Sequence, residues 1–290
     1  MERIQSAIQK ARAARERQQA GGAKQDEAVP RSAAPVAALA EAATPQARPA
    51  EEISAAWMAL PAYAPQPRQL EKSRVVSFEP GPKSTPFDVA RTRLLKQMRA
   101  NDWRRIAITS PGPGCGKTMT TLNLAFSLAR QSEIRTLVIE ADLRRPALAK
   151  ALGLKAHHSF STVLEGASQA RDHMVRHGPN LAFGTNYLPA KNAAELLQSA
   201  RVAEVLDEIE AEYAPDVMLF DMPPLQAGDD TLGFLDKVDA ALLVAAAGST
   251  TIEQVDLAEQ ELAAQTNVVG VVLNKCRYLD RDQDYGYGYY

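Results

Sequence analysis

The chain has 290 residues and a formal net charge of −2, with 33 Lys and Arg against 35 Asp and Glu. This balance excludes a strong overall attraction to nucleic acid, and we expect no nucleic-acid partner. Two cysteines, Cys115 and Cys276, are too few for a disulfide framework and suit a reducing compartment. The longest apolar run, 240–247, is far shorter than the ~20 residues of a membrane-spanning helix. We therefore expect a cytoplasmic protein that reaches the membrane only through a partner.

The first 19 residues are rich in Lys and Arg. Within them Ile4, Ile8, Ala11 and Ala14 recur at helical spacing, which predicts a short, weakly amphipathic helix. A helix of this kind serves either as a docking element or as a solvated segment with no partner. The sequence leaves both alternatives open.

Residues 20–86 have a different composition, dominated by Ala, Pro, Glu and Gln. They hold ten of the chain's 18 prolines. Such a segment buries too little apolar surface to offset the entropy lost on ordering, so we expect 1–86 to be a largely disordered N-terminal region. Trp57, Met58 and Leu60 form an isolated apolar spot in it, which we interpret as a chance cluster rather than a docking motif.

From Phe87 the composition becomes globular, and apolar strands alternate with helical patterns. This alternation predicts an α/β fold, a mostly parallel sheet with helices on both faces, over residues 87–276. Strands are expected at 106–109, 137–140, 181–184, 218–221, 241–245 and 268–273. Helices are expected at 87–98, 117–131, 146–152, 193–199, 201–213, 230–237 and 252–264. A tyrosine-rich tail, 277–290, follows the domain.

The first expected strand runs into a glycine-rich turn, then Gly-Lys-Thr and a helix. This order is typical of a phosphate-binding loop, in which backbone N–H groups and the N-terminus of the helix face the anion. In the common form of the motif a glycine occupies the position of Pro111. The residues expected to contact nucleotide are Gly114, Cys115, Gly116, Lys117, Thr118 and Met119.

Carboxylates follow two more of the expected strands. Glu140 and Asp142 come at the end of one strand, before Arg144 and Arg145, and Asp221 ends another strand before a Pro-Pro turn. Ligands bind parallel sheets at the carboxyl ends of the strands, so these acids are expected beside the phosphate loop. There, Thr118, Asp142 and Asp221 are candidates to hold Mg²⁺.

These three strand-end motifs give the chain a family resemblance over residues 87–290. It resembles the bacterial tyrosine kinases (BY-kinases) of capsule and exopolysaccharide systems, within the MinD/ParA-like P-loop ATPases. Ser110, Pro113, Gly114, Gly116, Lys117 and Thr118 match the family's Walker A motif. Asp142, Arg144, Arg145 and Pro146 match its Walker A′ motif, in which Glu140 replaces the first Asp, and Asp221, Pro223 and Pro224 match its Walker B motif.

The resemblance implies a P-loop NTPase fold, ATP and Mg²⁺ as cofactors, and transfer of phosphate to tyrosine. Lys117 would then hold the β- and γ-phosphates, and Asn274, at the end of the last strand, would contact adenine. Glu140 is the extra carboxylate beside the γ-phosphate. We expect it to accept the proton of the tyrosine hydroxyl, with Lys117, Asp142 and Asp221 as the other catalytic residues.

The C-terminal tail is the expected phosphate acceptor. Family members phosphorylate such a tyrosine cluster, often in trans. The tail is polar and glycine-spaced, so its rings have no core to enter. The expected acceptors are Tyr278, Tyr285, Tyr287, Tyr289 and Tyr290.

The resemblance also implies partners. These are a membrane adaptor of the polysaccharide chain-length regulator type, a cognate phosphotyrosine phosphatase and other copies of the chain. The family's Glu-x-x-Arg-x-x-Arg motif, associated with a ring-shaped oligomer, corresponds here to Asp88, Arg91 and Leu94. Because the last arginine is absent, self-association is expected, and the sequence leaves open whether the oligomer is a ring.

Two other functions fit the same motifs. One is a MinD/ParA-type ATPase switch, which usually needs a second lysine near the start of the loop, where this chain has 111–113, Pro-Gly-Pro. The other is a nucleotide-binding scaffold of a polysaccharide export machine that has no kinase activity.

Overall fold

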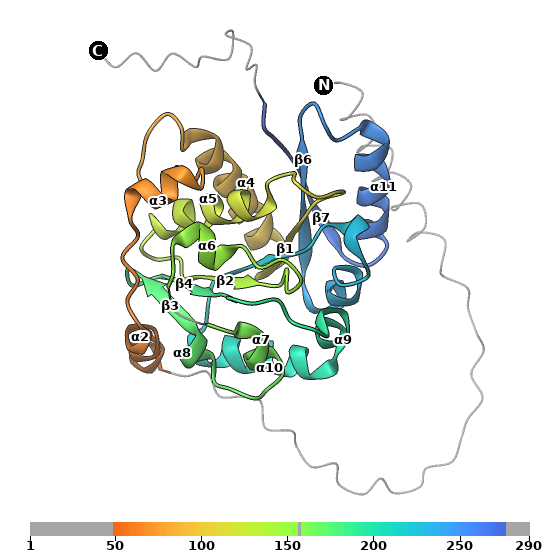
Figure 1. Ribbon diagram of the computed structural model, residues 1–290. Coiled ribbons are helices and arrows are strands. Elements are labelled where there is room, and N and C mark those ends of the chain that lie inside the picture. The colour runs from red at the N-terminus through yellow and green to blue at the C-terminus, as the bar shows by residue number, and fades with distance from the viewer. Residues whose placement is uncertain (1–48, 156–157, 277–290) are drawn as a thin grey trace, which may run out of the picture. The chain divides into compact units, whose positions relative to one another are not determined.

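A seven-stranded sheet forms the centre of the protein in the computed structural model, which describes residues 49–155 and 158–276 (Figure 1). The strand order is β3-β4-β2-β5-β1-β6-β7. All neighbouring strands are parallel except β3 and β4, which are antiparallel. The strands are β1 (Arg105–Thr109), β2 (Thr136–Glu140), β3 (Met174–His177), β4 (Leu181–Gly184), β5 (Val217–Asp221), β6 (Ala240–Ala246) and β7 (Asn267–Asn274).

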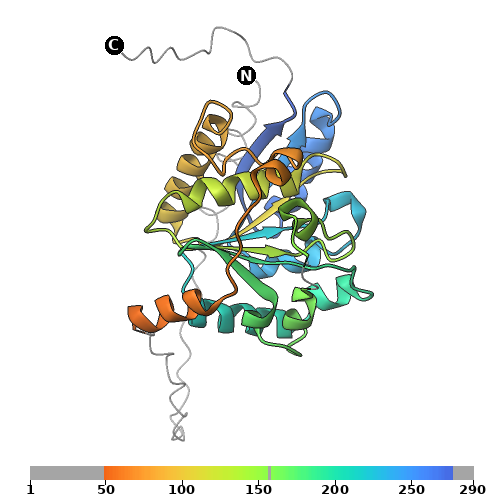
Figure 2. The ribbon, with the colours of Figure 1, turned by 60° about the vertical axis from the view of Figure 1, so that its left-hand side comes forward.

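Helices cover both faces of this sheet, as Figures 1 and 2 show from two directions. One face carries α3 (Pro67–Lys72), α4 (Thr85–Asn101), α5 (Lys117–Ala129) and α6 (Leu148–Leu152). The other carries α2 (Ala50–Ala59), α7 (Phe160–Leu164), α8 (Ala170–His173), α9 (Ala193–Gln198) and α10 (Ala200–Tyr213). The 3₁₀ turns η1 (Leu225–Ala227) and η2 (Leu232–Lys237) precede β6, and α11 (Ile252–Ala263) packs on β6 and β7.

The predicted fold class is confirmed, and each of the six predicted strands overlaps an observed one within about a residue. Central strands such as β2, β5 and β6 are buried along their whole length, which explains their continuous apolar sequences. Three elements of four or five residues were not predicted from the sequence, namely β3, α7 and α8. Elements this short are positioned by packing rather than by periodicity.

The expectation that the N-terminal region is disordered as far as residue 86 is wrong for 49–86, which form α2, α3 and the segments joining them to α4. The apolar spot is not a chance cluster, because Trp57 and Leu60 are 1% and 2% exposed in the core. The Trp57 indole contacts Tyr213 edge-on, and its Nε1 donates to the Tyr213 carbonyl at 2.6 Å. Trp57, together with the buried Leu60, Leu70 and Val75, therefore supplies apolar burial that helps to offset the entropy of ordering a Pro-rich segment.

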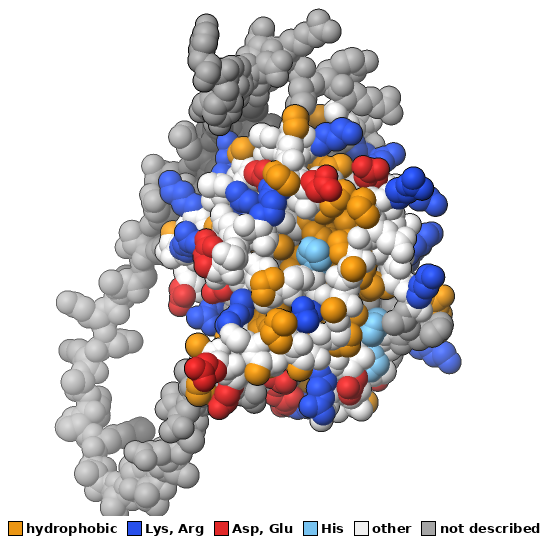
Figure 3. Space-filling model, turned by 90° about the vertical axis from the view of Figure 1, so that its left-hand side faces the viewer, with side chains coloured by type: hydrophobic (Ala, Val, Ile, Leu, Met, Phe, Trp, Pro, Cys, Tyr) orange, Lys and Arg blue, Asp and Glu red, His pale blue; other side chains and the backbone are white. Residues whose placement is uncertain are grey.

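The chain between α2 and α3 runs along the outer edge of the sheet. Arg176 in β3 donates its backbone N–H to Pro61 and accepts from Tyr63, at 2.9 and 2.7 Å. The Tyr63 hydroxyl donates to the Leu152 carbonyl at 2.6 Å. Figure 3 looks onto this side, where hydrophobic side chains gather and Lys and Arg lie around them. The segment thus covers backbone groups of an edge strand that would otherwise be open to pairing.

No helix among the described residues has both the length and the apolar character needed to cross a membrane.

Replacing Trp57 with Ala tests the docking of α2. We expect a loss of about 3–5 kcal/mol in the free energy of unfolding, because a large buried side chain and its hydrogen bond are removed. Met58 is the matched control on the same helix, since it is 55% exposed, and Met58→Ala should cost less than about 0.5 kcal/mol. Urea unfolding followed by circular dichroism measures both. Equal effects of the two substitutions would contradict the packing of α2.

Candidate functional site

The candidate site is built around β5, which lies between β1 and β2 in the sheet. Ile108 of β1 is in register with Asp221, and so is Glu140 of β2 on the other side. The carboxyl ends of three neighbouring strands therefore meet at one edge. The loop after β1, the loop after β2 and the Asp221 side chain lie side by side there, as the sequence predicted.

The loop after β1 takes a backbone shape that requires glycine. Gly114 and Gly116 have φ angles of +78° and +94°, which side-chain-bearing residues rarely adopt. A Cβ on Gly116 would also stand 2.3 Å from Asn274 Nδ2, which donates to the Cys115 carbonyl at 2.8 Å. Ser110 Oγ closes the start of the loop by donating to the Gly112 carbonyl at 2.7 Å. The loop is thus held in shape from both sides before any anion binds.

Helix α5 begins at Lys117, directly after this loop, with Thr118 and Met119 in its first turn. The helix has 13 residues, and its free backbone N–H groups give that end a partial positive charge. The Lys117 side chain is 8% exposed. A buried ammonium group beside a helix N-terminus forms a strong anion site, and the side chains of its neighbours must balance its charge.

The Asp221 carboxylate supplies one negative charge that balances the Lys117 ammonium, and one of its oxygens lacks a hydrogen bond among the described residues. The Asp221 side chain is 1% exposed, and Oδ1 accepts from Thr121 Oγ1 at 3.4 Å. Oδ2 is buried and has no hydrogen-bond partner among the residues that the structure describes. Burial raises the pKa of Asp221 to about 6, against the opposing effects of the Lys117 charge and the Thr118 hydroxyl. A buried, unpaired carboxylate oxygen beside a threonine hydroxyl suits Mg²⁺, which prefers oxygen ligands and uses few protein carboxylates.

A backbone hydrogen bond to Asp221 holds Asp142 beside this carboxylate. Its N–H donates to the Asp221 carbonyl at 2.8 Å, and its Oδ1 accepts from Arg145 N at 3.1 Å. Burial raises the pKa of Asp142, and the Lys117 charge acts in the opposite direction. Lys117 therefore influences both Asp142 and Asp221, and the three side chains form one electrostatic cluster.

Glu140 is placed differently from the expectation that it serves as the proton acceptor. Its Oε1 accepts the backbone N–H groups of Ala147 and Leu148, at the start of α6, and its Oε2 accepts that of Asn186 at 2.7 Å. The side chain is fully buried, and burial raises the pKa of Glu140 to about 8 against these three donors. Both oxygens are therefore occupied by backbone groups, and the residue fastens the two ends of the loop that carries Asp142.

Two residues of this edge carried no signal in the sequence. Asn186 accepts from Ser161 N at 2.8 Å and donates to the Glu140 carbonyl, so it joins β2, β4 and α7. Asp230 is 1% exposed and accepts from Arg144 Nε through both oxygens at 2.9 Å. Each residue lies outside the recognisable motifs, and only the fold brings it to its partner.

The comparisons with known proteins agree with this geometry. The model of the CobQ/CobB/MinD/ParA nucleotide-binding domain matches residues 106–284. The tyrosine-protein kinase CpsD of Streptococcus pneumoniae serotype 4 is 30% identical over 187 residues, which are 62% of this chain and 79% of CpsD. This chain belongs to the bacterial tyrosine kinases of that nucleotide-binding family.

Other relatives extend the match beyond the motifs. The tyrosine-protein kinase YwqD of Bacillus subtilis strain 168 is 29% identical over 222 residues, covering 76% of this chain and 92% of YwqD. The solved kinase domain of the Escherichia coli tyrosine kinase ETK superposes with a TM-score of 0.60 at 27% identity. That superposition covers 71% of this chain and 80% of the ETK domain.

In this tyrosine kinase the degenerate oligomerisation motif is used within the chain. Asp88 accepts from Arg130 and, at 2.5 Å, from Ser127 Oγ, and Arg91 Nη1 donates to the Ser127 carbonyl at 2.8 Å. The two retained residues of the motif thus attach α4 to α5, and Leu94 is buried between the helices and the sheet. The expected tyrosine acceptors at 278–290 lie outside the described residues.

Substitution at Glu140, the last residue of β2, and at Asp142, two residues later, separates a positioning role from a role in phosphate transfer. We expect Glu140→Gln to lower the free energy of unfolding by about 1–3 kcal/mol, because an amide NH₂ would face backbone N–H donors. Asp142→Asn should leave stability unchanged or raise it, since burial already disfavours its charge, and should abolish phosphate transfer. Urea unfolding and a phosphotyrosine immunoblot measure the two effects. A stable Glu140→Gln protein that binds nucleotide normally but has lost transfer would restore Glu140 as the base.

Proposed function

We propose that this protein is an ATP-dependent tyrosine autokinase of a capsule or exopolysaccharide system. The observation that carries the proposal is the cluster of Lys117, Asp142 and the half-paired Asp221 around a preformed phosphate loop. The chain belongs to the bacterial tyrosine kinases, and this supports tyrosine as the acceptor of the phosphate.

The position of each residue in the site determines which part of the nucleotide or which ion it would bind. Backbone N–H groups of 114–118 and the Lys117 ammonium bind the β- and γ-phosphates. Thr118, Asp142 and Asp221 hold Mg²⁺, which when bound neutralises phosphate charge. Asn274 lies against the loop at Cys115 and, in this proposal, adjoins the adenine. These contacts fix the γ-phosphate for in-line attack, and in such transfers positioning and charge stabilisation supply most of the catalysis.

Proton acceptance from the tyrosine hydroxyl is assigned to Asp142 in place of Glu140. Both oxygens of Glu140 accept backbone N–H groups, whereas among the described residues hydrogen bonding to Asp142 involves one oxygen. Burial raises the pKa of Asp142, which makes it a stronger base than a solvated aspartate.

The proposed substrate is the tyrosine cluster of a second copy of the chain, at positions 278, 285, 287, 289 and 290. Several phosphates on one short tail would add strong negative charge to a segment that already has Asp280, Asp282 and Asp284. Repulsion between such tails would loosen the assembly. A chain-length-regulator adaptor at the membrane and a phosphotyrosine phosphatase complete the proposed cycle.

Mixing two forms of the full chain tests this function. An inactive Lys117→Met chain carrying a heavy-isotope label is incubated with active protein, ATP and Mg²⁺, and phosphorylation sites are mapped by mass spectrometry. We expect phosphate on the labelled tail only when active protein is present, because removing the Lys117 charge removes the phosphate contact. Lys150→Met, on the exposed side of α6, is the control that should stay active.

The distribution of phosphate distinguishes the alternatives. Phosphate confined to the active chain would contradict transfer in trans. ATP hydrolysis with no phosphotyrosine on either chain would favour the MinD/ParA-type ATPase switch, and nucleotide binding with neither activity would favour a scaffold.

A further inference from the structure

The ion pair between Arg144 and Asp230 lies at the same edge of the sheet as the proposed site, and the reaction described so far does not use it. Asp230 is 1% exposed, and both of its oxygens accept from Arg144 Nε at 2.9 Å. The Arg144 side chain is 51% exposed. Its terminal nitrogens, Nη1 and Nη2, have no hydrogen-bond partner among the residues that the structure describes. The buried carboxylate therefore fixes one side of the guanidinium and leaves its outer end available to another group.

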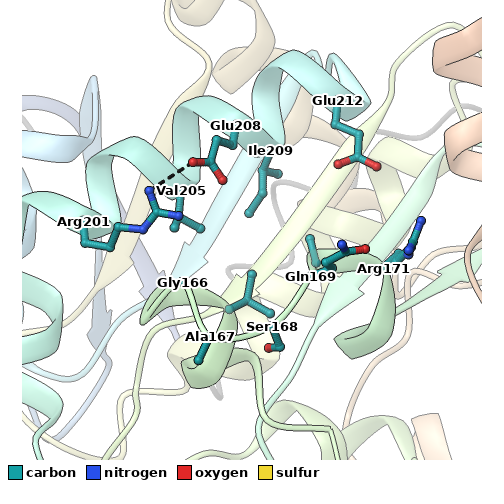
Figure 4. Close-up of a pocket in the computed structure, with 12 residues that line it drawn as sticks. Gly166, Ala167, Ser168, Gln169, Arg171, Arg201, Val205, Glu208, Ile209 and Glu212 are labelled. Atoms are coloured by element: carbon teal, nitrogen blue, oxygen red, sulfur yellow. Dashed lines mark hydrogen bonds and ion pairs between the residues drawn. The ribbon is translucent and has the colours of Figure 1, made fainter.

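Two other arginines of the chain, Arg105 and Arg201, form their ion pairs through a terminal nitrogen. Figure 4 shows Arg201 in a groove of about 490 Å³, where its guanidinium points toward Glu208. Its Nη1 donates to Glu208 at 3.1 Å and to Glu204 at 2.9 Å. Arg144 differs from these two, because its pair with the carboxylate leaves the N–H groups of both terminal nitrogens unused.

The segment that carries Asp230 is bonded to the phosphate loop. This segment follows β5, and its residue Gln226 donates its backbone N–H to the Pro111 carbonyl, at the start of the loop, at 3.2 Å. Further along the segment, a Cβ on Gly228 would stand 3.9 Å from Arg144 Nη2. The outer end of the guanidinium therefore lies beside a segment that is attached to the phosphate loop.

The pair also lies close to Asp142, which precedes Arg144 by two residues. Burial is the main cause that raises the pKa of Asp142, and the Asp230 charge raises it further. Asp230 is therefore near enough to act on the carboxylate that we assign to Mg²⁺ and to the tyrosine proton. Both ends of the ion pair thus adjoin the site of phosphate transfer.

The phosphate loop supplies a single cation to this site, because Lys117 is the only Lys or Arg within 110–118. During transfer, negative charge spreads over the equatorial oxygens of the γ-phosphoryl group. Several phosphoryl-transfer enzymes neutralise this charge with an arginine in addition to Mg²⁺ and lysine, and some supply that arginine from the same chain. A guanidinium with unused terminal N–H groups suits the role, because its planar fork matches a pair of phosphate oxygens.

We propose that Arg144 is a catalytic residue whose terminal N–H groups bind the γ-phosphoryl group during transfer, and that Asp230 is the residue that positions it. The inference rests on the proposed kinase function. In that step the tyrosine oxygen forms a bond to the γ-phosphorus, and the bond from this phosphorus to the β,γ-bridging oxygen breaks. The electron pair of the broken bond leaves with ADP, and the tyrosine proton passes to Asp142. Arg144 keeps its protons and its charge throughout.

Chemical rescue by guanidinium tests the role of Arg144. Transfer at saturating ATP is measured as phosphotyrosine formed on a Lys117→Met acceptor chain, and ADP affinity is measured by isothermal titration calorimetry. Arg144→Ala should transfer at least about 100-fold more slowly and keep its ADP affinity within about threefold, because ADP has no γ-phosphate. Guanidinium chloride at about 20 mM should raise the rate of this variant at least about tenfold, since the free ion can bind beside Asp230.

The same assay tests the positioning role of Asp230. Asp230→Asn keeps an oxygen for Arg144 Nε but removes the charge, so it should slow transfer about tenfold and leave ADP affinity unchanged. In Arg144→Ala/Asp230→Asn the rescue by guanidinium should be lost, because the carboxylate that holds the ion is absent. Arg201→Ala is the matched control, since it removes an exposed arginine ion pair in the groove of Figure 4, and it should keep the rate within about twofold.

Thermal unfolding of each variant verifies that it is folded. If the unpaired Asp230 carboxylate prevents Arg144→Ala from folding, the double variant removes this buried charge and should show the same loss of transfer with ADP affinity retained. Transfer at the parent rate without Arg144, a loss of ADP affinity as large as the loss of rate, or rescue that persists without Asp230 would each overturn the proposal. A parent chain that forms no phosphotyrosine would contradict the kinase function itself, and with it this role of Arg144.

Discussion

The position of β5 between β1 and β2 is the constraint on which the site depends. Its backbone pairs with both neighbours, and the Asp221 carbonyl accepts the N–H groups of Ala141 and Asp142 just beyond β2. The loop carrying Lys117 and the loop carrying Asp142 are thereby fixed on either side of one buried carboxylate. The Lys117 charge opposes the effect of burial on the pKa of both acids, so the pairing of β5 with its two neighbours places the three charged side chains where they interact.

Much of the fold and the core of the site could be predicted from sequence, because these features are encoded locally. Central strands such as β5 are continuous apolar runs, and Gly114 and Gly116 mark a loop whose positive φ angles glycine tolerates. The carboxyl ends of parallel strands share an edge, so the sequence alone predicts that Lys117 and Asp221 lie close together.

What sequence reasoning missed depends on contacts between distant segments. The composition around Trp57 predicts disorder, and only the Tyr213 surface, 156 residues further on, gives this side chain a place in the core. Glu140 matches a catalytic position in the family pattern, yet the N–H groups of α6 and Asn186 take both of its oxygens. A motif specifies which residue stands at a strand end, whereas the neighbouring backbone decides what its side chain does.

The most direct test of this account is the Mg²⁺ dependence of ADP binding, measured by isothermal titration calorimetry on the full chain and on Asp221→Asn. The account predicts that Mg²⁺ strengthens ADP binding to the parent at least about tenfold and has little effect on the variant, because the buried unpaired oxygen is a ligand of the ion. An Asp221→Asn protein that gains as much affinity from Mg²⁺ as the parent would contradict the central role of this carboxylate.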